Sequence, residues 1–182
     1  MMTEQGFPVN HTTTTTVTTS NTTVQTDIRY DPLYIRSVPG ILKCVEIVLN
    51  LLVFLSASFS KFSHVAHMSF TSLICGFGFW VTGILLGCYA FHVVEKFYRI
   101  PWLKFELIYT GIWAFFLMIG STFCAAYMGS GAVFGVVSFF GYINMIAYAY
   151  DCFLKFKSIQ NGEIAQGERI KTTSTVTSPS AY

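Results

Sequence analysis

Charged residues are scarce in this chain: Asp, Glu, Lys and Arg make up 11% of its 182 residues, against about a quarter in an ordinary soluble domain. The net charge is only +2, and the chain lacks the concentrated basic face that a nucleic-acid-binding protein needs. The hydrophobic share of 53% and the mean hydropathy of +0.54 are instead typical of a protein that crosses a membrane several times.

Cysteine pairs and metal-ligand spacings are also missing. The five cysteines lie in or beside apolar runs and form no C-x-x-C pair, so neither a disulfide framework nor a zinc site is predicted. His64 and His67 have no carboxylate or cysteine cluster near them in the sequence, and we expect them to be solvated loop residues. No nucleophile–base pair and no phosphate-binding glycine loop is present. The sequence therefore predicts no enzyme, no cofactor and no metal site.

Four long apolar runs are present, each close to the roughly 20 residues that cross a bilayer as a helix. We predict an all-α membrane protein, a four-helix transmembrane bundle, with disordered cytoplasmic tails because the tails are polar and rich in Ser and Thr. The expected domains are a Thr-rich tail (1–29), a four-span domain (30–157) and a Ser/Thr-rich tail (158–182). The expected spans are 39–60, 68–91, 105–128 and 132–154.

The first span carries three polar side chains on one helical face. Lys43, Glu46 and Asn50 are spaced i, i+3 and i+7, and such a face needs other helices beside it. Counted from Ile41 at about 1.5 Å per residue, Glu46 lies about 7 Å and Asn50 about 13 Å into the membrane. Asn144 in the fourth span lies at a depth comparable to that of Asn50. We therefore expect the two amides to face each other or to share an interior polar layer.

Lys43 and Glu46 are expected to belong to a polar layer near the cytoplasmic edge, with Asp151 and Glu106 as candidate neighbours. One interpretation is a local ion pair between Lys43 and Glu46 that lets both charges stay near the interface. The alternatives are a proton or ion path through Glu46 and a site that binds a partner. The chain has no series of acids through the bilayer and no inverted repeat of the transporter type, which disfavours the path.

Small residues on the helix faces predict close helix contacts. Three glycines share one face of the second span, two of them in the G-x-x-x-G spacing, and two more begin the fourth span. These helix-packing positions are Gly76, Gly83, Gly87, Gly131 and Gly135.

Three of the cysteines are expected near one membrane surface. They are candidates for S-acylation, with small packed hydrophobes as the alternative interpretation. These three are Cys44, Cys88 and Cys152.

Lys and Arg are distributed unequally between the two ends of the spans, because the connector 61–67 holds only Lys61 and nine lie on the other side. By the positive-inside rule both termini are then cytoplasmic. The glycosylation sequons at Asn10 and Asn21 would then remain unmodified. The nine basic residues are Arg29, Arg36, Lys96, Arg99, Lys104, Lys155, Lys157, Arg169 and Lys171.

The first span opens with YIRSVPGILK, from Tyr34 to Lys43, and Glu46 follows. Together with four spans, cytoplasmic termini and a very short third connector, this opening resembles MARVEL-domain proteins, nearest the chemokine-like-factor (CKLF-like) branch. The resemblance covers about residues 30–157. It implies a non-enzymatic tetraspan associated with vesicle trafficking, membrane apposition and cholesterol-rich membrane regions, and it carries over no catalytic residue.

These observations predict a multi-pass organiser or adaptor of the plasma membrane or vesicles, acting in trafficking, membrane apposition, cell contact or fusion. The expected partners are the lipid bilayer, including cholesterol-rich regions, and other membrane proteins or further copies of the chain, bound by lateral helix packing. A small ion or proton conductor using Glu46 is the first alternative. A claudin-like junction component is the second, but the connector 61–67 lacks the long segment with a Trp and a cysteine pair that such proteins share.

Overall fold

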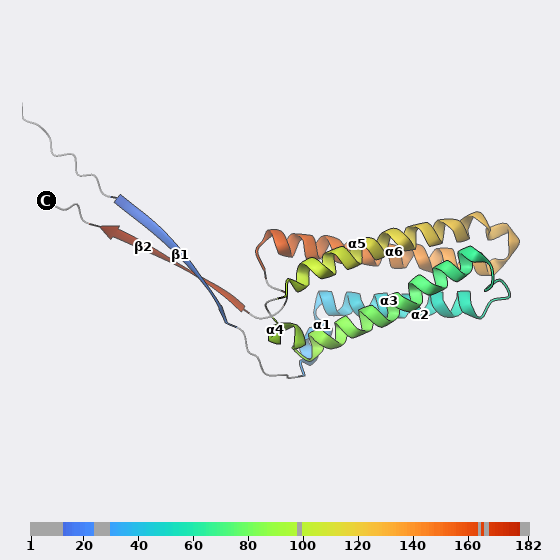
Figure 1. Cartoon of the computed structure of the whole chain (residues 1–182), viewed down its shortest axis with the longest axis horizontal. Coiled ribbons are helices and arrows are strands. Elements are labelled where there is room, and N and C mark those ends of the chain that lie inside the picture. Colours follow the sequence, from blue (N-terminus) through green and yellow to red (C-terminus); the bar gives the residue numbers. More distant parts are fainter. Residues whose placement is uncertain (1–12, 24–29, 98–99, 164, 166–167, 179–182) are drawn as a thin grey trace, which may run out of the picture. The chain divides into compact units, whose positions relative to one another are not determined.

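The computed structural model describes residues 13–23, 30–97, 100–163, 165 and 168–178, and the chain divides into two units. The larger unit contains four long helices that run side by side (Figure 1). These are α2 (Val38–Ser58), α3 (Ala66–Ala90), α5 (Trp102–Ala126) and α6 (Ala132–Gln160). The short helices are α1 (Pro32–Arg36), α4 (Val93–Lys96) and the 3-10 helix η1 (Met128–Ser130).

Each long helix has the length and composition of a membrane span, which confirms the predicted all-helical, four-span fold. The observed bounds of the first three helices lie within three residues of the expected ones. The fourth helix is longer than expected, since α6 continues past residue 154 to Gln160. Lys155, the residue after the expected end of this span, has a buried side chain that belongs to the bundle interior.

The family-like opening of the first span has a clear role in the structure. The Ser37 hydroxyl accepts a hydrogen bond from the Gly40 N–H at 3.3 Å and so caps α2, while Pro39 stands in the first turn, where no amide hydrogen is needed. The backbone of α1 passes so close to Gly40 that a Cβ there would collide with the carbonyl of Tyr34. The segment thus builds a tight corner between α1 and α2.

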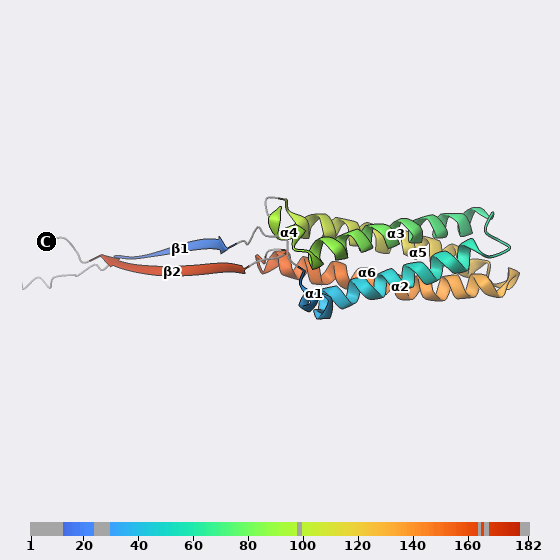
Figure 2. The same cartoon turned by 90° about the horizontal axis from the view of Figure 1, so that it is seen from below.

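The long helices alternate in direction. Helix α2 packs against α3 and α6, and α5 packs against α6 and α3. The connectors 59–65 and 127–131 lie together at one end of the helices, here called the Lys61 end, and α1 and α4 lie at the opposite end, here called the α1 end (Figures 1 and 2).

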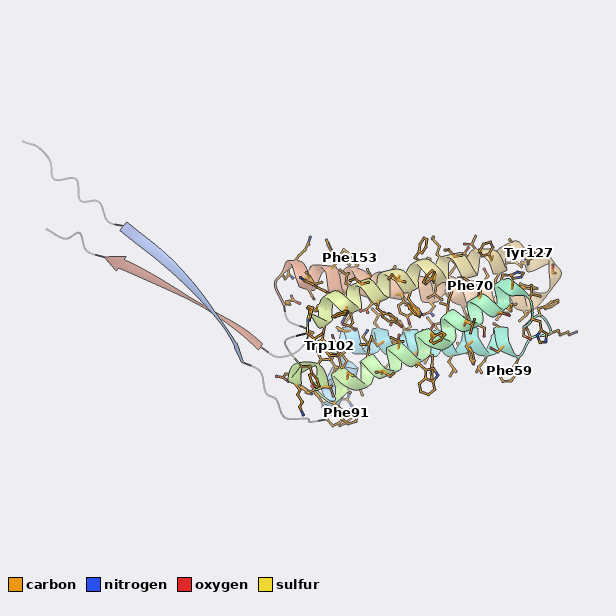
Figure 3. The ribbon with its side chains drawn as sticks, in the orientation of Figure 1. Phe59, Phe70, Phe91, Trp102, Tyr127 and Phe153 are labelled. Carbon is orange, nitrogen blue, oxygen red and sulfur yellow. The ribbon has the colours of Figure 1, made fainter. Side chains whose placement is uncertain are left out.

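The side chains of this unit separate into an inner apolar cluster and an outer apolar surface. Val53, Met68, Leu117 and Val137 are almost completely buried. Many aromatic side chains instead project outward along the helices, Phe59 among them at 84% exposed (Figure 3). In a membrane-spanning bundle such side chains face lipid.

The smaller unit pairs two strands, β1 (Thr13–Thr23) and β2 (Glu168–Ser178). They are antiparallel, and their register runs from Thr13 opposite Ser178 to Thr23 opposite Glu168. The strands are rich in threonine, whose branched Cβ favours extended backbone. A Thr-rich composition is too polar to form a packed core, but it is compatible with the pairing of two strands.

Candidate functional site

The polar stripe of α2 points into the bundle. Lys43, Glu46 and Asn50 are each fully buried, while Ile41, Val45 and Val48 on other faces of the same helix are exposed. Unpaired charges are costly at membrane depth, so the role of these three side chains depends on the partners that the other helices supply.

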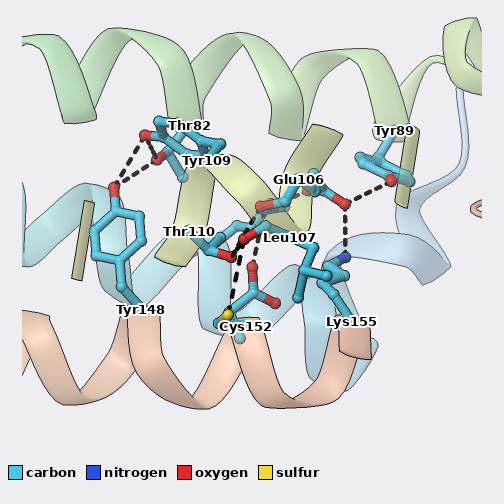
Figure 4. Close-up of polar contacts among 12 residues, drawn as sticks. Thr82, Tyr89, Glu106, Leu107, Tyr109, Thr110, Tyr148, Cys152 and Lys155 are labelled. Atoms are coloured by element: carbon cyan, nitrogen blue, oxygen red, sulfur yellow. Dashed lines mark hydrogen bonds and ion pairs between the residues drawn. The ribbon is translucent and has the colours of Figure 1, made fainter. Parts of the chain in front are cut away.

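A buried ion cluster, consisting of Lys43, Glu106, Asp151 and Lys155, occupies the α1 end of the bundle. The Lys43 Nζ lies 2.6 Å from Glu106 Oε1 and 3.3 Å from Asp151 Oδ2. The Lys155 Nζ lies 2.8 Å from Glu106 Oε2 (Figure 4). Two ammonium groups and two carboxylates from α2, α5 and α6 thus balance one another in charge.

Two tyrosines close this cluster. The Tyr89 hydroxyl of α3 donates a hydrogen bond to Glu106 Oε2 at 2.7 Å (Figure 4), and Lys155 Nζ lies 5.3 Å from the centre of the Tyr89 ring. The Tyr34 ring of α1 stacks on Tyr89, with centroids 4.9 Å apart. Burial, together with the negative charge of Glu106, raises the pKa of the Tyr34 phenol well above its ordinary value. Glu106 of α5 therefore bonds to α2, α3 and α6, and α1 joins the cluster through the stacking of Tyr34 on Tyr89.

A second polar layer, the amide layer, lies deeper in the bundle. The Asn144 Nδ2 donates to Asn50 Oδ1 at 3.0 Å, and the Asn50 Nδ2 donates to the Tyr148 hydroxyl at 2.8 Å. The Tyr148 oxygen is also 2.7 Å from Thr82 Oγ1, which is 2.9 Å from the Tyr109 hydroxyl (Figure 4). The structure thus joins the two asparagines and extends the network to α3 and α5.

The tyrosines and threonine of these layers are absent from the sequence-based site. The helical spacing of α6 could have identified Tyr148. One face of this helix carries residues separated by four, three and four positions, namely Asn144, Tyr148, Asp151 and Lys155. No comparable pattern singles out Thr82, because hydroxyl side chains are common in membrane helices and can bond to their own backbone.

Glu46 lies between the two layers along α2 but joins neither by a hydrogen bond. Both of its carboxyl oxygens are buried without a hydrogen-bond partner in the described part of the chain. The expected local ion pair with Lys43 is not formed among these residues. Lys43 reaches across to α5 and α6 instead, because Glu106 and Asp151 bring their carboxylates within 3.3 Å of its ammonium group.

The polar interior extends only part of the way through the bundle. From Val53 towards the Lys61 end, apolar side chains such as Met68 and Leu117 are buried together with the hydroxyl side chains of Thr71, Ser121 and Ser138. No carboxyl, side-chain amide or ammonium group is buried in this half of the described bundle, so the ion cluster and the amide layer have no counterpart there.

The predicted glycine positions fall into two groups. A Cβ at Gly76 would meet the Phe54 ring at 3.3 Å, one at Gly131 would meet Phe62 at 2.9 Å, and one at Gly135 would meet Met128 at 3.4 Å. Gly83 and Gly87 have nothing within 4 Å of such a Cβ. These two glycines therefore make no close helix contact within the described part of this chain.

The closest helix approaches use glycines that were not among the predicted packing positions. A Cβ at Gly78 would meet the indole nitrogen of Trp113 at 2.6 Å, and one at Gly120 would meet Thr71 Oγ1 at 2.7 Å. One at Gly141 would overlap the Ser121 hydroxyl. None of the three has another glycine four residues away, so the G-x-x-x-G spacing does not find them; the looser small-x-x-x-small spacing does apply to Gly120, which Cys124 follows four residues later.

The three candidate S-acylation cysteines differ in their surroundings. Cys44, Cys88 and Cys152 are all partly buried, and the Cys152 thiol is 3.7 Å from the Leu107 carbonyl of α5, to which it donates (Figure 4). Acylation of Cys152 would therefore require its thiol to leave the α5–α6 contact. Within the described ranges, no group of three or more His, Cys, Asp or Glu side chains is arranged to hold a metal ion.

The comparisons with known proteins agree with this architecture. The model of the family described as MARVEL, membrane-associating domain, matches residues 34–154, which include all four spans except the last residues of α6. The CKLF-like MARVEL transmembrane domain-containing protein 8 of Mus musculus is 27% identical over 169 residues, which cover 85% of this chain and 95% of that protein. No solved structure matches the chain. The family match spans well over half of the sequence, and the chain therefore belongs to the MARVEL family of membrane-associating domains.

Proposed function

We propose that this protein is a non-enzymatic membrane organiser or adaptor, acting in vesicle trafficking, membrane apposition, cell contact or fusion. MARVEL-domain proteins are commonly linked to membrane apposition and trafficking, and four spans with small connectors suit a protein that works within the plane of the membrane. The partners proposed are the bilayer, including cholesterol-rich regions, other membrane proteins and further copies of the chain. The location proposed is the plasma membrane or vesicles, with both termini in the cytoplasm.

The observation that carries the proposal is the open stretch of α3 at Gly83 and Gly87. The bundle already packs through Gly78, Gly120 and Gly141, whereas a Cβ at either glycine of the G-x-x-x-G pair would meet no atom of the described residues within 4 Å. This spacing lets a second helix approach closely in a membrane, where packing contacts drive association. Trp80 and Ile84 on the same helix are exposed beside it and add apolar contact area.

The test is lateral association in native membranes. Gly83→Leu and Gly87→Leu should reduce resonance energy transfer between tagged copies, and should reduce labelling of neighbouring proteins by an enzyme fused to the C-terminal tail. Gly129→Leu is the matched control, because Gly129 also has nothing within 4 Å but lies in η1 and not on α3. If both α3 variants keep the same neighbours and the same transfer efficiency as the control, lateral assembly through this stretch is wrong.

A conducting role has no comparable support. The polar layers do not reach the Lys61 end through the described residues, and Glu46 would be the acid of such a path. Liposome flux that is present with the native chain and lost with Glu46→Gln would reverse this preference.

A further inference from the structure

A groove at the Lys61 end lies between the end of α2 and the start of α6. Its volume is about 640 Å³, and it is lined by Leu55, Phe59, Phe62 and Val133, with the hydroxyl side chain of Ser130 and the ammonium side chain of Lys61. Volumes of roughly 300 to 1,000 Å³ are usual for small-molecule sites. Neither polar layer of the interior reaches it, so it is separate from the site described above.

The charge of the groove is unusual for this end of the protein. Lys61 is the only Asp, Glu, Lys or Arg between Glu46 and Glu95, and there is none between Glu106 and Asp151. The whole Lys61 end therefore contains a single charged side chain, and it lines this groove. No carboxylate in these stretches competes for its ammonium group.

The start of α6 contributes a second source of positive potential. Gly131, Ala132 and Val133 line the groove, and no side chain caps this helix. The first amide groups of a helix have no partner within the helix, and the end of a 29-residue helix carries a partial positive charge. The Gly131 N–H already donates to the Met128 carbonyl at 3.4 Å, which leaves the first amides of α6, those of Ala132 and Val133, beside the groove that Lys61 also lines. This combination favours an anionic oxygen there.

The position of the groove in the membrane indicates which kind of molecule carries the anionic oxygen. Leu55 lies one turn before the end of a membrane-spanning helix and Lys61 lies beyond it. The groove therefore starts at the level of the headgroups and continues along apolar side chains into the level of the acyl chains. A soluble anion would leave the apolar part empty, and a purely apolar ligand would leave the cation without a partner.

We propose that this groove binds a phospholipid, with the phosphodiester at Lys61 and at the amides of α6, and one acyl chain along Leu55, Phe59 and Val133. The ligand class is a diacyl lipid with a phosphodiester headgroup, and the site is independent of the lateral contact proposed for Gly83 and Gly87.

The test measures the retention of dioleoylphosphatidylcholine by the purified full-length chain in detergent, using native mass spectrometry. This lipid has no net charge, so general attraction to an anionic membrane does not explain its retention. We expect one lipid per chain, and a loss of affinity of about tenfold in Lys61→Gln, as for the removal of a charge-assisted contact. Lys157→Gln, which removes an exposed lysine at the α1 end, should bind as the native chain does.

Two further arms separate the parts of the proposal. Val133→Trp should fill the groove and also reduce retention, with helix content measured by circular dichroism to show that the variant is folded; Lys61→Gln changes only an exposed side chain and gives an answer even if Val133→Trp does not fold. Dioleoylglycerol has the same chains without the phosphodiester and should be retained weakly. Equal retention of the two lipids, unchanged binding by Lys61→Gln, or displacement of the lipid by inorganic phosphate alone would each overturn the proposal.

Discussion

Glu106 is the residue on which the ion cluster depends, because it bonds to Lys43, Lys155 and Tyr89 at once. Glu106→Gln would leave two buried ammonium groups to share the carboxylate of Asp151. Breaking a buried ion pair by removing one partner costs about 3–5 kcal/mol, so we expect a large loss of stability. Thermal unfolding of the purified protein in detergent measures it, with the exposed Glu163→Gln as control.

Glu46→Gln should behave in the opposite way although Glu46 is buried as deeply as Glu106. Its carboxyl group has no hydrogen bond or ion pair to lose among the described residues, and the cluster already pairs two cations with two carboxylates. An amide of the same shape removes a surplus acid, so we expect a change of less than about 1 kcal/mol, as replacing a polar group by a similar one is nearly neutral when no partner is stranded. A loss as large as that of Glu106→Gln would mean that Glu46 is an ion-pair partner after all.

The amides of Asn50 and Asn144 should be coupled, because one donates to the other at 3.0 Å. Hydrogen bonds of this kind inside membranes contribute about 0.6 kcal/mol on average and up to about 2 kcal/mol. A double-mutant cycle with Asn50→Ala, Asn144→Ala and the double variant removes the separate contribution of Tyr148 and reports the pair alone. A coupling energy of zero would contradict the contact.

At the level of the helices, the bundle depends on glycines outside the G-x-x-x-G spacing. Gly78 lets α3 approach α5 so closely that a Cβ would lie 2.6 Å from the Trp113 indole nitrogen and 2.9 Å from Asn50 Oδ1. Gly78→Ala should therefore destabilise the protein by about 1–3 kcal/mol, the usual cost of overpacking. Gly83→Ala on the same helix is the matched control and should be neutral or slightly stabilising, since alanine favours helix and the site is open. Thermal unfolding should rank the two in this order, and equal effects would contradict the packing described here.

The helices also show what a sequence does and does not predict. Length and hydropathy are properties of each segment alone, so the four spans and the inward face of Lys43, Glu46 and Asn50 could be predicted. The partners of that face depend on how four helices rotate against one another, which no single segment encodes. For this reason the expected fourth span ends at residue 154, although Lys155 reaches Glu106. For the same reason the sequence favours an ion pair of Lys43 with Glu46, whereas Lys43 contacts α5 and α6.

For the helical unit as a whole, the interior is asymmetric along the helix axes. The α1 end contains the ion cluster, the middle contains the amide layer, and the Lys61 end contains apolar side chains and a single external cation. This distribution gives the two ends different roles. At the α1 end, polar contacts hold α1 and all four long helices together. At the Lys61 end, the surface is apolar and available for contact with lipid.

The same asymmetry predicts how the protein is inserted. Lys and Arg gather at the α1 end and only Lys61 stands at the other, so the α1 end should face the cytoplasm. Lys61→Cys should react with a membrane-impermeant maleimide in intact cells, and Lys157→Cys should react only after permeabilisation, with the unaltered chain measuring the background of its five native cysteines. The sequons at Asn10 and Asn21 would then be cytoplasmic, and glycosidase treatment should leave the mobility of the chain unchanged. Labelling of Lys157→Cys in intact cells would show that the orientation is the opposite one. The expectation for both sequons would then be reversed too, because one insertion determines the side on which every connector and both tails lie.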